Sequence, residues 1–438
     1  MRVPRLTPDT SSLRESRELR LVVLGNVVSS IGSQATLVAL PYQLYVETHS
    51  ALLVGLLGAA ELVPLATMAL LGGAIADRMD RRRLLLFDQV GLVAIAAGLA
   101  IAAFMGHPAV LTLYLLGGAL AGFTSLQNVA RAAIVPNLVS PRSLRSALAL
   151  TYGLQQVTMV VGPGIGGVMI AAVGLPWTYL ADAVSCFAMV FAVIAIAPQP
   201  PTWTEGHESV RRSIAQGLRY VASNQALLGS FAIDLVAMTF GMPRALFAVL
   251  AVSYYHAGAS GTGVLYAAVS AGASIGALTT GWLTHARRLG LIVIWSVVVW
   301  GSMVALVALA GSLWVAAALL AVAGAADSVS AVCRSTINQT VTPDRLRGRM
   351  SAVFSLVVTS GPRLGDIESG SVAGAAGPRF SVLSGGLACL FGVVVIVAAF
   401  PALARYGSDR PAATEGAGGE RGEPASARAA SDEPASAR

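Results

Sequence analysis

The amino-acid sequence predicts an all-α integral membrane protein with about twelve transmembrane helices in two six-helix bundles. Three observations support this fold class: the composition is strongly apolar, apolar stretches of membrane-spanning length recur along the chain, and the two halves of the chain resemble each other. Of the 438 residues, 55% are hydrophobic and only 12% are charged, and the mean hydropathy is +0.71. Soluble domains contain far more charge, so the chain is expected to lie in lipid.

Apolar stretches follow one another with short polar breaks between them. A helix needs about 20 residues to cross roughly 30 Å of hydrocarbon. By this length the spans are expected at residues 20–46, 51–73, 84–104, 109–131, 145–172, 177–197, 226–252, 262–284, 289–310, 313–334, 350–375 and 379–402. The first span shows no small-residue cleavage site, so we expect a retained helix and not a signal peptide.

Arginines gather in alternate loops, and the chain contains no lysine. They precede span 1, follow spans 2, 4, 8 and 10, and recur in the central polar segment, whereas the opposite loops are nearly bare except for Arg379. The positive-inside rule therefore predicts that both termini are cytoplasmic, in a multi-pass protein of the cell membrane. Topology and contact with anionic lipid also explain the net charge of +7, so no nucleic-acid partner is expected.

The longest polar interruption divides the spans into two groups of six. Residues 1–18 are expected to form a cytoplasmic N-terminal segment, 19–197 the first bundle, 198–224 a cytoplasmic linker and 225–402 the second bundle. The linker becomes amphipathic towards its end, as in a helix on a membrane surface. Residues 403–438 consist mainly of Ala, Gly, Glu, Arg and Ser, and this composition predicts a disordered tail.

The two halves contain matching segments. "SPRSLRSALAL" (140–150) opens span 5 and "TPDRLRGRMSAV" (342–353) opens span 11, and each has a proline at the expected first helical position. The offset between Pro141 and Pro343 is 202 residues. Two halves of six spans that enter from the same side predict parallel repeats, an architecture of secondary transporters.

The loop after span 2 reads "GGAIADRMDRRRLLL" (72–86) and resembles the signature of the major facilitator superfamily between helices 2 and 3. The residues that match it are Gly73, Asp77, Arg78, Arg81 and Arg82, while Asp80 stands where the family usually has glycine. The resemblance implies the two-bundle fold of that superfamily and a gate in which Asp77 caps a helix of the other half in one state. An ordinary positive-inside anchor is the alternative, above all for the arginines.

Span 5 contains "GPGIGG" (162–167), which resembles the antiporter motif on helix 5 of exporters in the same superfamily. Its residues are Gly162, Pro163, Gly166 and Gly167. The glycines permit close helix packing and the proline frees backbone groups; generic small-residue packing is the competing interpretation. The arginine that this family usually carries early in helix 4 is missing, so the coupling acid must be sought elsewhere.

Ionisable residues inside spans are costly and therefore candidates for function. The proton-coupling candidates are Glu61, Asp327, Asp366 and Glu368. For Asp327, an acid that lines the cavity and a member of a buried ion pair are equally good interpretations. Arg363 and Asp366 are three residues apart and share a helix face, so we expect a structural ion pair between them. Glu368 points about 200° away from Asp366 and is expected to lie opposite Glu61, because the superfamily places helices 2 and 11 side by side.

Other polar residues in the spans have more than one interpretation. Asp182 and Asp234 are interpreted as structural, and Arg131 and Arg334 are expected to reach the membrane surface from span ends. Asn26, Gln34 and Asn128 are candidates for a substrate cavity, although hydrogen bonding between helices explains them equally well.

No feature indicates catalysis or a cofactor. The three cysteines all fall inside spans without metal-ligand spacing, so neither a metal site nor a disulfide is expected. We find no phosphate-binding loop and no nucleophile beside a base, and we predict that the protein is not an enzyme.

Residues 18–402 resemble the exporter branch of the superfamily that includes enterobactin exporters and macrolide efflux proteins. The similar phrases include "GMPRALFAVLA" (241–251) and "GPRLGDIESG" (361–370). This resemblance implies export of a siderophore or drug-like small molecule by a monomer, in exchange for protons. An importer of the same fold, coupled by proton symport, and a non-transporting membrane sensor or assembly protein are the alternatives.

Overall fold

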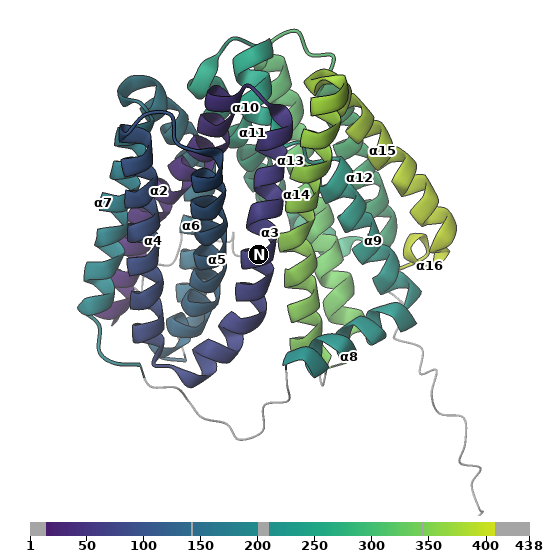
Figure 1. Ribbon diagram of the computed structural model, residues 1–438. Helices are drawn as coiled ribbons and strands as arrows, with labels where there is room; N and C mark the ends of the chain where they lie inside the picture. Colours follow the sequence, from purple (N-terminus) through teal and green to yellow (C-terminus); the bar gives the residue numbers. More distant parts are fainter. Residues whose placement is uncertain (1–14, 142, 200–209, 344–345, 408–438) are drawn as a thin grey trace, which may run out of the picture.

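The computed structural model describes residues 15–141, 143–199, 210–343 and 346–407 and is helical almost throughout (Figure 1). The first half contains α2 (Arg17–Thr48), α3 (Ala51–Arg78), α4 (Arg81–Phe104), α5 (Val110–Ile134), η1 (Val135–Asn137), α6 (Leu144–Val173) and α7 (Leu175–Ile194). The second contains α8 (Val210–Ser223), α9 (Gln225–Phe240), α10 (Leu246–Val249), η2 (Leu250–Tyr254), α11 (Gly258–Leu278), η3 (Thr280–His285), α12 (Leu289–Val307), α13 (Leu313–Val341), α14 (Arg347–Ala376), α15 (Pro378–Ala399) and α16 (Pro401–Ala404).

Among these described helices, ten are long and apolar enough to cross a membrane, or up to eleven if the end of α8 and α9 count as one bent span. Helix α14 is not among the ten, and it carries the three charges at Arg363, Asp366 and Glu368. The multi-pass, all-helical class is therefore confirmed. Most of the expected tail, residues 408–438, lies outside the described residues.

Short polar residues and glycines set the helix ends. Asp80 accepts hydrogen bonds from the backbone N–H groups of Arg82 (2.9 Å) and Arg83 (3.2 Å) at the start of α4. Helices α6 and α14 both end at a glycine with positive φ, Gly174 (85°) and Gly377 (92°), a conformation that side chains rarely adopt. The equivalent helix in each half therefore ends at a glycine in the same backbone conformation.

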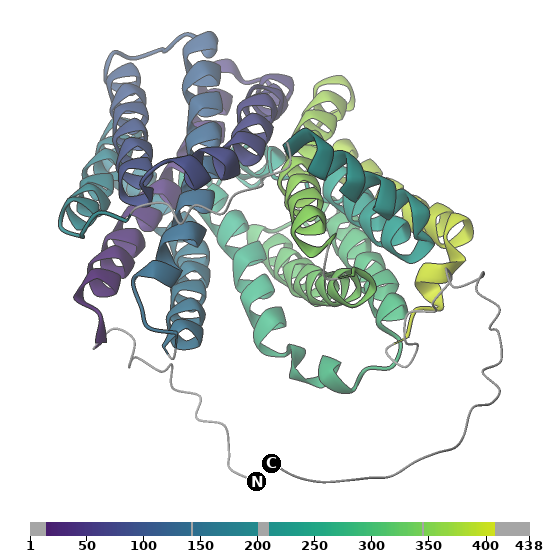
Figure 2. The same cartoon turned by 90° about the horizontal axis from the view of Figure 1, so that it is seen from below.

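The described helices form two groups. Helices α2 to α7 pack on one another, α9 to α15 pack on one another, and the groups meet mainly where α3 contacts α14 and where α6 contacts α11 (Figures 1 and 2). Helix α8 lies at the end of the molecule where α3 ends and α14 begins. We call this the arginine-rich end, because the arginine-bearing connections lie there.

The seventh expected span, 226–252, is not one continuous helix. Helix α9 ends at Phe240, and the chain resumes helical structure only at Leu246, first as α10 and then as a π-helical turn, η2. Pro243 lies in the break, where it lacks the N–H that a continuous helix would use. The break places Arg244 and Ala245 beside the interface between the two halves.

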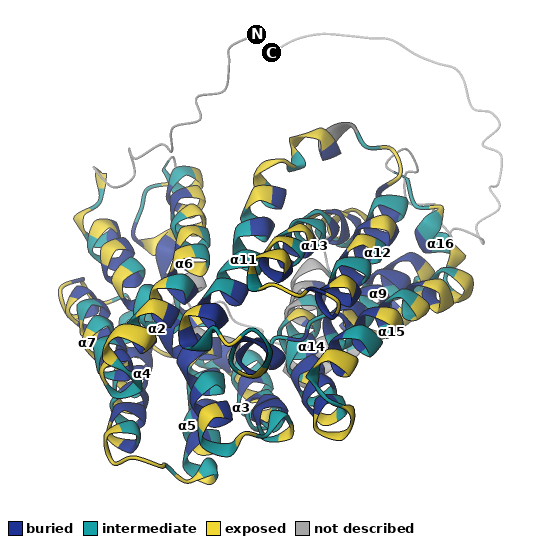
Figure 3. Cartoon of the chain, turned by 90° about the horizontal axis from the view of Figure 1, so that it is seen from above, coloured by how far each residue is buried: buried dark blue, intermediate teal, exposed yellow. Residues whose placement is uncertain are grey.

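Large apolar side chains cover the outside of the molecule. Trp177, Phe191, Trp295 and Phe391 are all more than half exposed, and exposed positions alternate with buried ones around each helix (Figure 3). Small residues and leucines fill the interior. An apolar exterior of this kind suits contact with lipid and not with water.

Candidate functional site

A cavity of about 250 Å³ lies between the two halves. Its charged lining residues are Glu61, Arg244, Arg363 and Asp366, and its polar ones are Ser33, Gln34, Thr36, Thr124, Ser125, Asn128, Tyr266 and Thr359. Leucines, valine and proline from α2, α3 and α5 line much of the remainder. The cavity therefore combines apolar walls with hydrogen-bonding groups, as small-molecule sites do.

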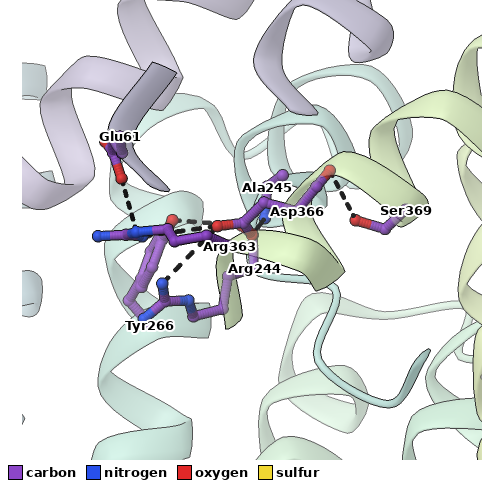
Figure 4. Close-up of polar contacts among 7 residues, drawn as sticks. All are labelled: Glu61, Arg244, Ala245, Tyr266, Arg363, Asp366 and Ser369. Atoms are coloured by element: carbon purple, nitrogen blue, oxygen red, sulfur yellow. Dashed lines mark hydrogen bonds and ion pairs between the residues drawn. The ribbon is translucent and has the colours of Figure 1, made fainter. Parts of the chain in front are cut away.

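Four charges form one connected network at this cavity (Figure 4). The Arg363 guanidinium on α14 lies 2.8 Å from the Glu61 carboxylate on α3 (Nε to Oε2) and 3.5 Å from Asp366 (Nη1 to Oδ2). Arg244, in the break after α9, lies 3.7 Å from Asp366 (Nη2 to Oδ2). Two acids face two cations, so the network is neutral when all four are ionised.

Asp366 also joins the network to the broken helix. Its Oδ1 accepts a hydrogen bond from the backbone N–H of Ala245 at 3.0 Å, and the Tyr266 hydroxyl donates to the Arg244 carbonyl at 3.2 Å. A buried ion pair is expensive to dehydrate and is tolerated only when further hydrogen bonds satisfy its atoms. These contacts supply such bonds and fix Arg244 at the wall of the cavity.

The Glu61–Arg363 ion pair joins the two halves, because Glu61 belongs to the first half and Arg363 to the second. The side chains are 11% and 16% exposed respectively, so water weakens this attraction far less than it would at a surface. Removing either partner would leave the other charge with less compensation. Among the contacts between described residues, this ion pair is therefore one that must break when the halves separate at α3 and α14.

Two glycine crossings bring the halves together beyond the network, away from the arginine-rich end. A Cβ at Gly55 of α3 would lie 2.6 Å from the Cα of Gly370 of α14, and one at Gly167 of α6 would lie 2.9 Å from the Cα of Gly263 of α11. At such crossings only hydrogen allows the backbones to approach this closely. Nearer the arginine-rich end, Thr124 and Asn128 line the cavity and are exposed. The cavity is thus closed by the crossings and opens towards the arginine-rich end.

Substituting Gly167 by valine is expected to favour the state in which this crossing is open. The side chain would overlap the carbonyl oxygen of Ala259, 2.7 Å from the Cβ position, and overpacking costs about 1–3 kcal/mol. Distances between spin labels at Met105 and Leu309, measured by pulsed electron resonance, should increase. Gly153→Val in the same helix is the matched control, because a Cβ there meets nothing within 4 Å. Unchanged distances in Gly167→Val would contradict the assignment of this glycine crossing as the contact that closes the cavity.

The comparisons with known proteins agree with this architecture. The model of the transmembrane secretion effector family, part of the major facilitator superfamily, matches residues 11–412. The chain belongs to this family. An enterobactin exporter of Salmonella typhi is 31% identical over 398 residues, covering 88% of this chain and 92% of that protein. An enterobactin exporter of Shigella boydii serotype 4 is 31% identical over 417 residues, covering 92% of this chain and 97% of that protein.

Solved structures share the fold at low sequence identity. A bacterial homologue of the human lysosomal transporter Spinster, in an inward-facing conformation, aligns with a TM-score of 0.67 and 16% identity, covering 89% of this chain and 96% of that one. A bacterial homologue of the iron transporter ferroportin, also inward-facing, aligns with a TM-score of 0.64 and 18% identity, covering 87% of this chain and 98% of that one. The protein is a membrane transporter of the major facilitator superfamily and not an enzyme.

The superfamily loop after α3 connects elements of one half. Gly73, Asp77 and Arg78 lie in the last turns of α3, but their side-chain surroundings are outside the described part of the chain. Arg82 donates hydrogen bonds to the carbonyls of Val193 (3.0 Å) and Ile194 (2.7 Å) at the end of α7. The backbone N–H of Arg81 donates to the Gln199 carbonyl at 3.0 Å. Asp80 and Arg82 thus form hydrogen bonds with backbone groups at helix ends of the first half. The gate role of Asp77 stays a prediction.

The helix 5 motif packs in two directions. A Cβ at Gly162 or at Gly166 would meet α2, at the side chain of Gln34 and the backbone of Ala35, respectively. Gly167 instead faces α11 across the interface, as described above. Pro163 lies inside α6 without ending it. The motif therefore contributes both to the first half and to the contact between halves.

The described contacts correct the expectation about Glu368 and support the buried-pair interpretation of Asp327. Helix α14 turns Arg363, Asp366 and Gly370 towards α3, so Glu368 lies on another face and the expectation that it sits opposite Glu61 is wrong. Asp327 does not line the cavity; it lies 3.5 Å from Arg334, which also contacts Asp234. The Arg363–Asp366 contact expected from the three-residue spacing is present.

Two further residues, Arg334 and Asn26, lie elsewhere than the sequence suggested. Arg334 does not reach the membrane surface, since it is 4% exposed and paired with acids. Gln34 and Asn128 line the cavity, whereas Asn26 is buried within the first half, accepts a hydrogen bond from Ser30 and does not line it. Sequence reasoning noted Arg244 as an ionisable residue within span 7 without assigning it a role, and it missed Tyr266. The signal for Arg244 was its position directly after the helix-breaking Pro243.

Proposed function

We propose that the protein exports small amphipathic molecules, siderophores or drug-like compounds, from the cytoplasm by alternating access in exchange for protons. The enterobactin exporters that resemble this chain support export, and the mixed apolar and polar cavity supports an amphipathic substrate. The observation that carries the proton mechanism is the Glu61–Arg363 ion pair between the halves.

The orientation in this proposal follows from the arginines. With the arginine-rich end in the cytoplasm, both termini are cytoplasmic and the protein lies in the cell membrane. The cavity then faces inwards and the glycine crossings close its outer side. A substrate would enter from the cytoplasm or from the inner leaflet, past Thr124 and Asn128.

Substrate and proton compete for Glu61 in this mechanism. A substrate that donates a hydrogen bond to Glu61 and accepts one from Arg363 compensates both groups as their ion pair separates, so the outer side can open. Once the substrate leaves, a proton from outside neutralises Glu61 and stabilises the separated state. Closure of the crossings returns Arg363 to Glu61, and because the guanidinium stabilises the ionised carboxylate, the proton leaves into the cytoplasmic cavity.

Everted membrane vesicles from a bacterial strain without other exporters test this proposal. Vesicles containing the protein should accumulate labelled enterobactin or a lipophilic fluorescent dye when their interior is acidified, and an ionophore that collapses the pH gradient should abolish the accumulation. Vesicles without the protein are the control. Accumulation that persists after the gradient collapses would exclude proton exchange, and accumulation only in right-side-out vesicles would indicate import.

A further inference from the structure

A second buried carboxylate lies apart from the cavity network, on α7. Asp182 is 1% exposed, and its described partners are hydroxyl and thiol groups. The hydroxyl of Thr36 donates to Oδ2 at 2.5 Å and that of Ser33 to Oδ1 at 3.4 Å, while the Cys186 thiol lies 3.6 Å from Oδ1. Gly32 lets α2 approach α7 closely, because a Cβ at this position would lie 2.7 Å from the Oδ1 atom of Asp182.

No cation contacts this carboxylate among the described residues. Helices α2, α4 and α6 pack against α7. Their described charged residues are Arg17, Glu18, Arg20 and Glu47 on α2, Arg81, Arg82, Arg83 and Asp88 on α4, and Arg145 on α6, and the ionisable neighbours on α7 itself are Tyr179 and Cys186. Apart from the Cys186 thiol, none of these forms a described hydrogen bond or ion pair with Asp182. An ionised carboxylate without a counter-charge is costly in such surroundings, whereas a carboxylic acid is tolerated.

Two of the residues that contact Asp182 also line the cavity. Ser33 and Thr36 are cavity-lining residues and, at the same time, the hydrogen-bond partners of Asp182. A hydroxyl can donate one hydrogen bond and accept another, so it can form a hydrogen bond with the carboxyl group in either its protonated or its ionised form. It can also relay a proton between the carboxyl group and water. Thr36 is fully buried and Ser33 is partly exposed, so Ser33 connects the buried acid with the cavity.

We propose that Asp182, Ser33 and Thr36 form a second proton-binding site, which exchanges its proton with the central cavity. This site belongs wholly to the first half, whereas the Glu61 network bridges the two halves. The proposal of a proton site at Asp182 does not depend on the direction of transport or on the substrate. If the protein is a proton-driven exporter, the site provides a second proton that can move in each cycle.

Infrared difference spectroscopy on the purified full-length protein in lipid nanodiscs tests the site without substrate or transport. The wild-type protein minus Asp182→Asn should show the C=O band of one carboxylic acid, which converts to carboxylate bands as the pH is raised across the range in which the protein stays folded. The band should shift within minutes of transfer to D₂O. Thr36→Val should change its frequency, because the shortest hydrogen bond to the carboxyl group is lost. Glu61→Gln should leave the band in place.

Two results would overturn the proposal. Absence of a carboxylic acid band across this pH range would mean that Asp182 is ionised throughout, and a band that does not exchange in D₂O over hours would mean that the proton is sealed in the structure. If Asp182→Asn fails to fold, as judged by gel filtration, the difference between wild type and Ser33→Ala/Thr36→Val replaces it. A band unchanged in that double variant would also overturn the site. A failed transport assay would not affect either measurement.

Discussion

Replacing Glu61 by glutamine is expected to abolish proton-driven accumulation of substrate while leaving substrate exchange intact. Glutamine keeps the shape of the side chain but holds no exchangeable proton, and it cannot form the 2.8 Å ion pair with Arg363. The two halves can still separate and close, so labelled and unlabelled substrate should exchange across the membrane at a rate within about threefold of wild type. Reconstituted vesicles allow both quantities to be measured, with enterobactin as the first substrate to examine.

Glu368→Gln is the matched control for this experiment. It makes the same chemical change in the same membrane region, but Glu368 does not line the cavity and lies on a different face of α14 from Arg363. Accumulation by Glu368→Gln should therefore follow wild type across the pH range. If Glu368→Gln lost accumulation and Glu61→Gln kept it, the proton would have to be assigned to Glu368.

Replacing Arg334 by methionine is expected to cause the largest loss of stability. Arg334 is 4% exposed and lies between two acids, Asp234 on α9 and Asp327 on α13. Methionine fills a similar volume but leaves both carboxylates without a counter-charge, and breaking a buried pair in this way costs about 3–5 kcal/mol. The loss should appear as a lower midpoint of thermal unfolding in detergent.

A charge-neutral variant separates this electrostatic effect from lost packing. Arg334→Met combined with Asp234→Asn and Asp327→Asn should recover most of the stability, because no isolated charge remains buried. Arg145→Met at the exposed start of α6 should leave the midpoint unchanged. If the triple variant were as unstable as the single one, packing of the arginine side chain would be the main contribution.

The sequence predicts the fold class and much of the helix arrangement. Span length and hydropathy are local properties, so the expected spans 51–73 and 84–104 lie within α3 and α4. The Arg363–Asp366 contact was predictable for the same reason, since three-residue spacing on one helix decides it. The match between the halves was visible at the starts of spans 5 and 11; the shared ending of α6 and α14 at Gly174 and Gly377 came from the structure.

Contacts between helices were harder to predict. The partner of Glu61 depends on the rotation of α14 about its own axis, which is set by the Gly55–Gly370 crossing and not by hydropathy. The break at Gly241–Ala245 placed Arg244 at the cavity, although composition alone favoured a continuous span. Asp182 was interpreted as structural because it lies near the end of a span. Its hydroxyl partners Ser33 and Thr36 lie on α2, 149 and 146 residues away in the sequence, so local spacing could not reveal them.

The glycine crossings have a consequence for the speed of the transport cycle. Gly55 meets Gly370 and Gly167 meets Gly263 through their backbones, so no side chain has to change its rotamer when these surfaces part or meet. Ordering a long side chain costs up to about 2 kcal/mol of conformational entropy, and these positions avoid that cost at each closure. The activation barrier for opening should therefore reside mainly in separating charge at Arg363, and the turnover rate should depend more steeply on external pH than on the fluidity of the lipid.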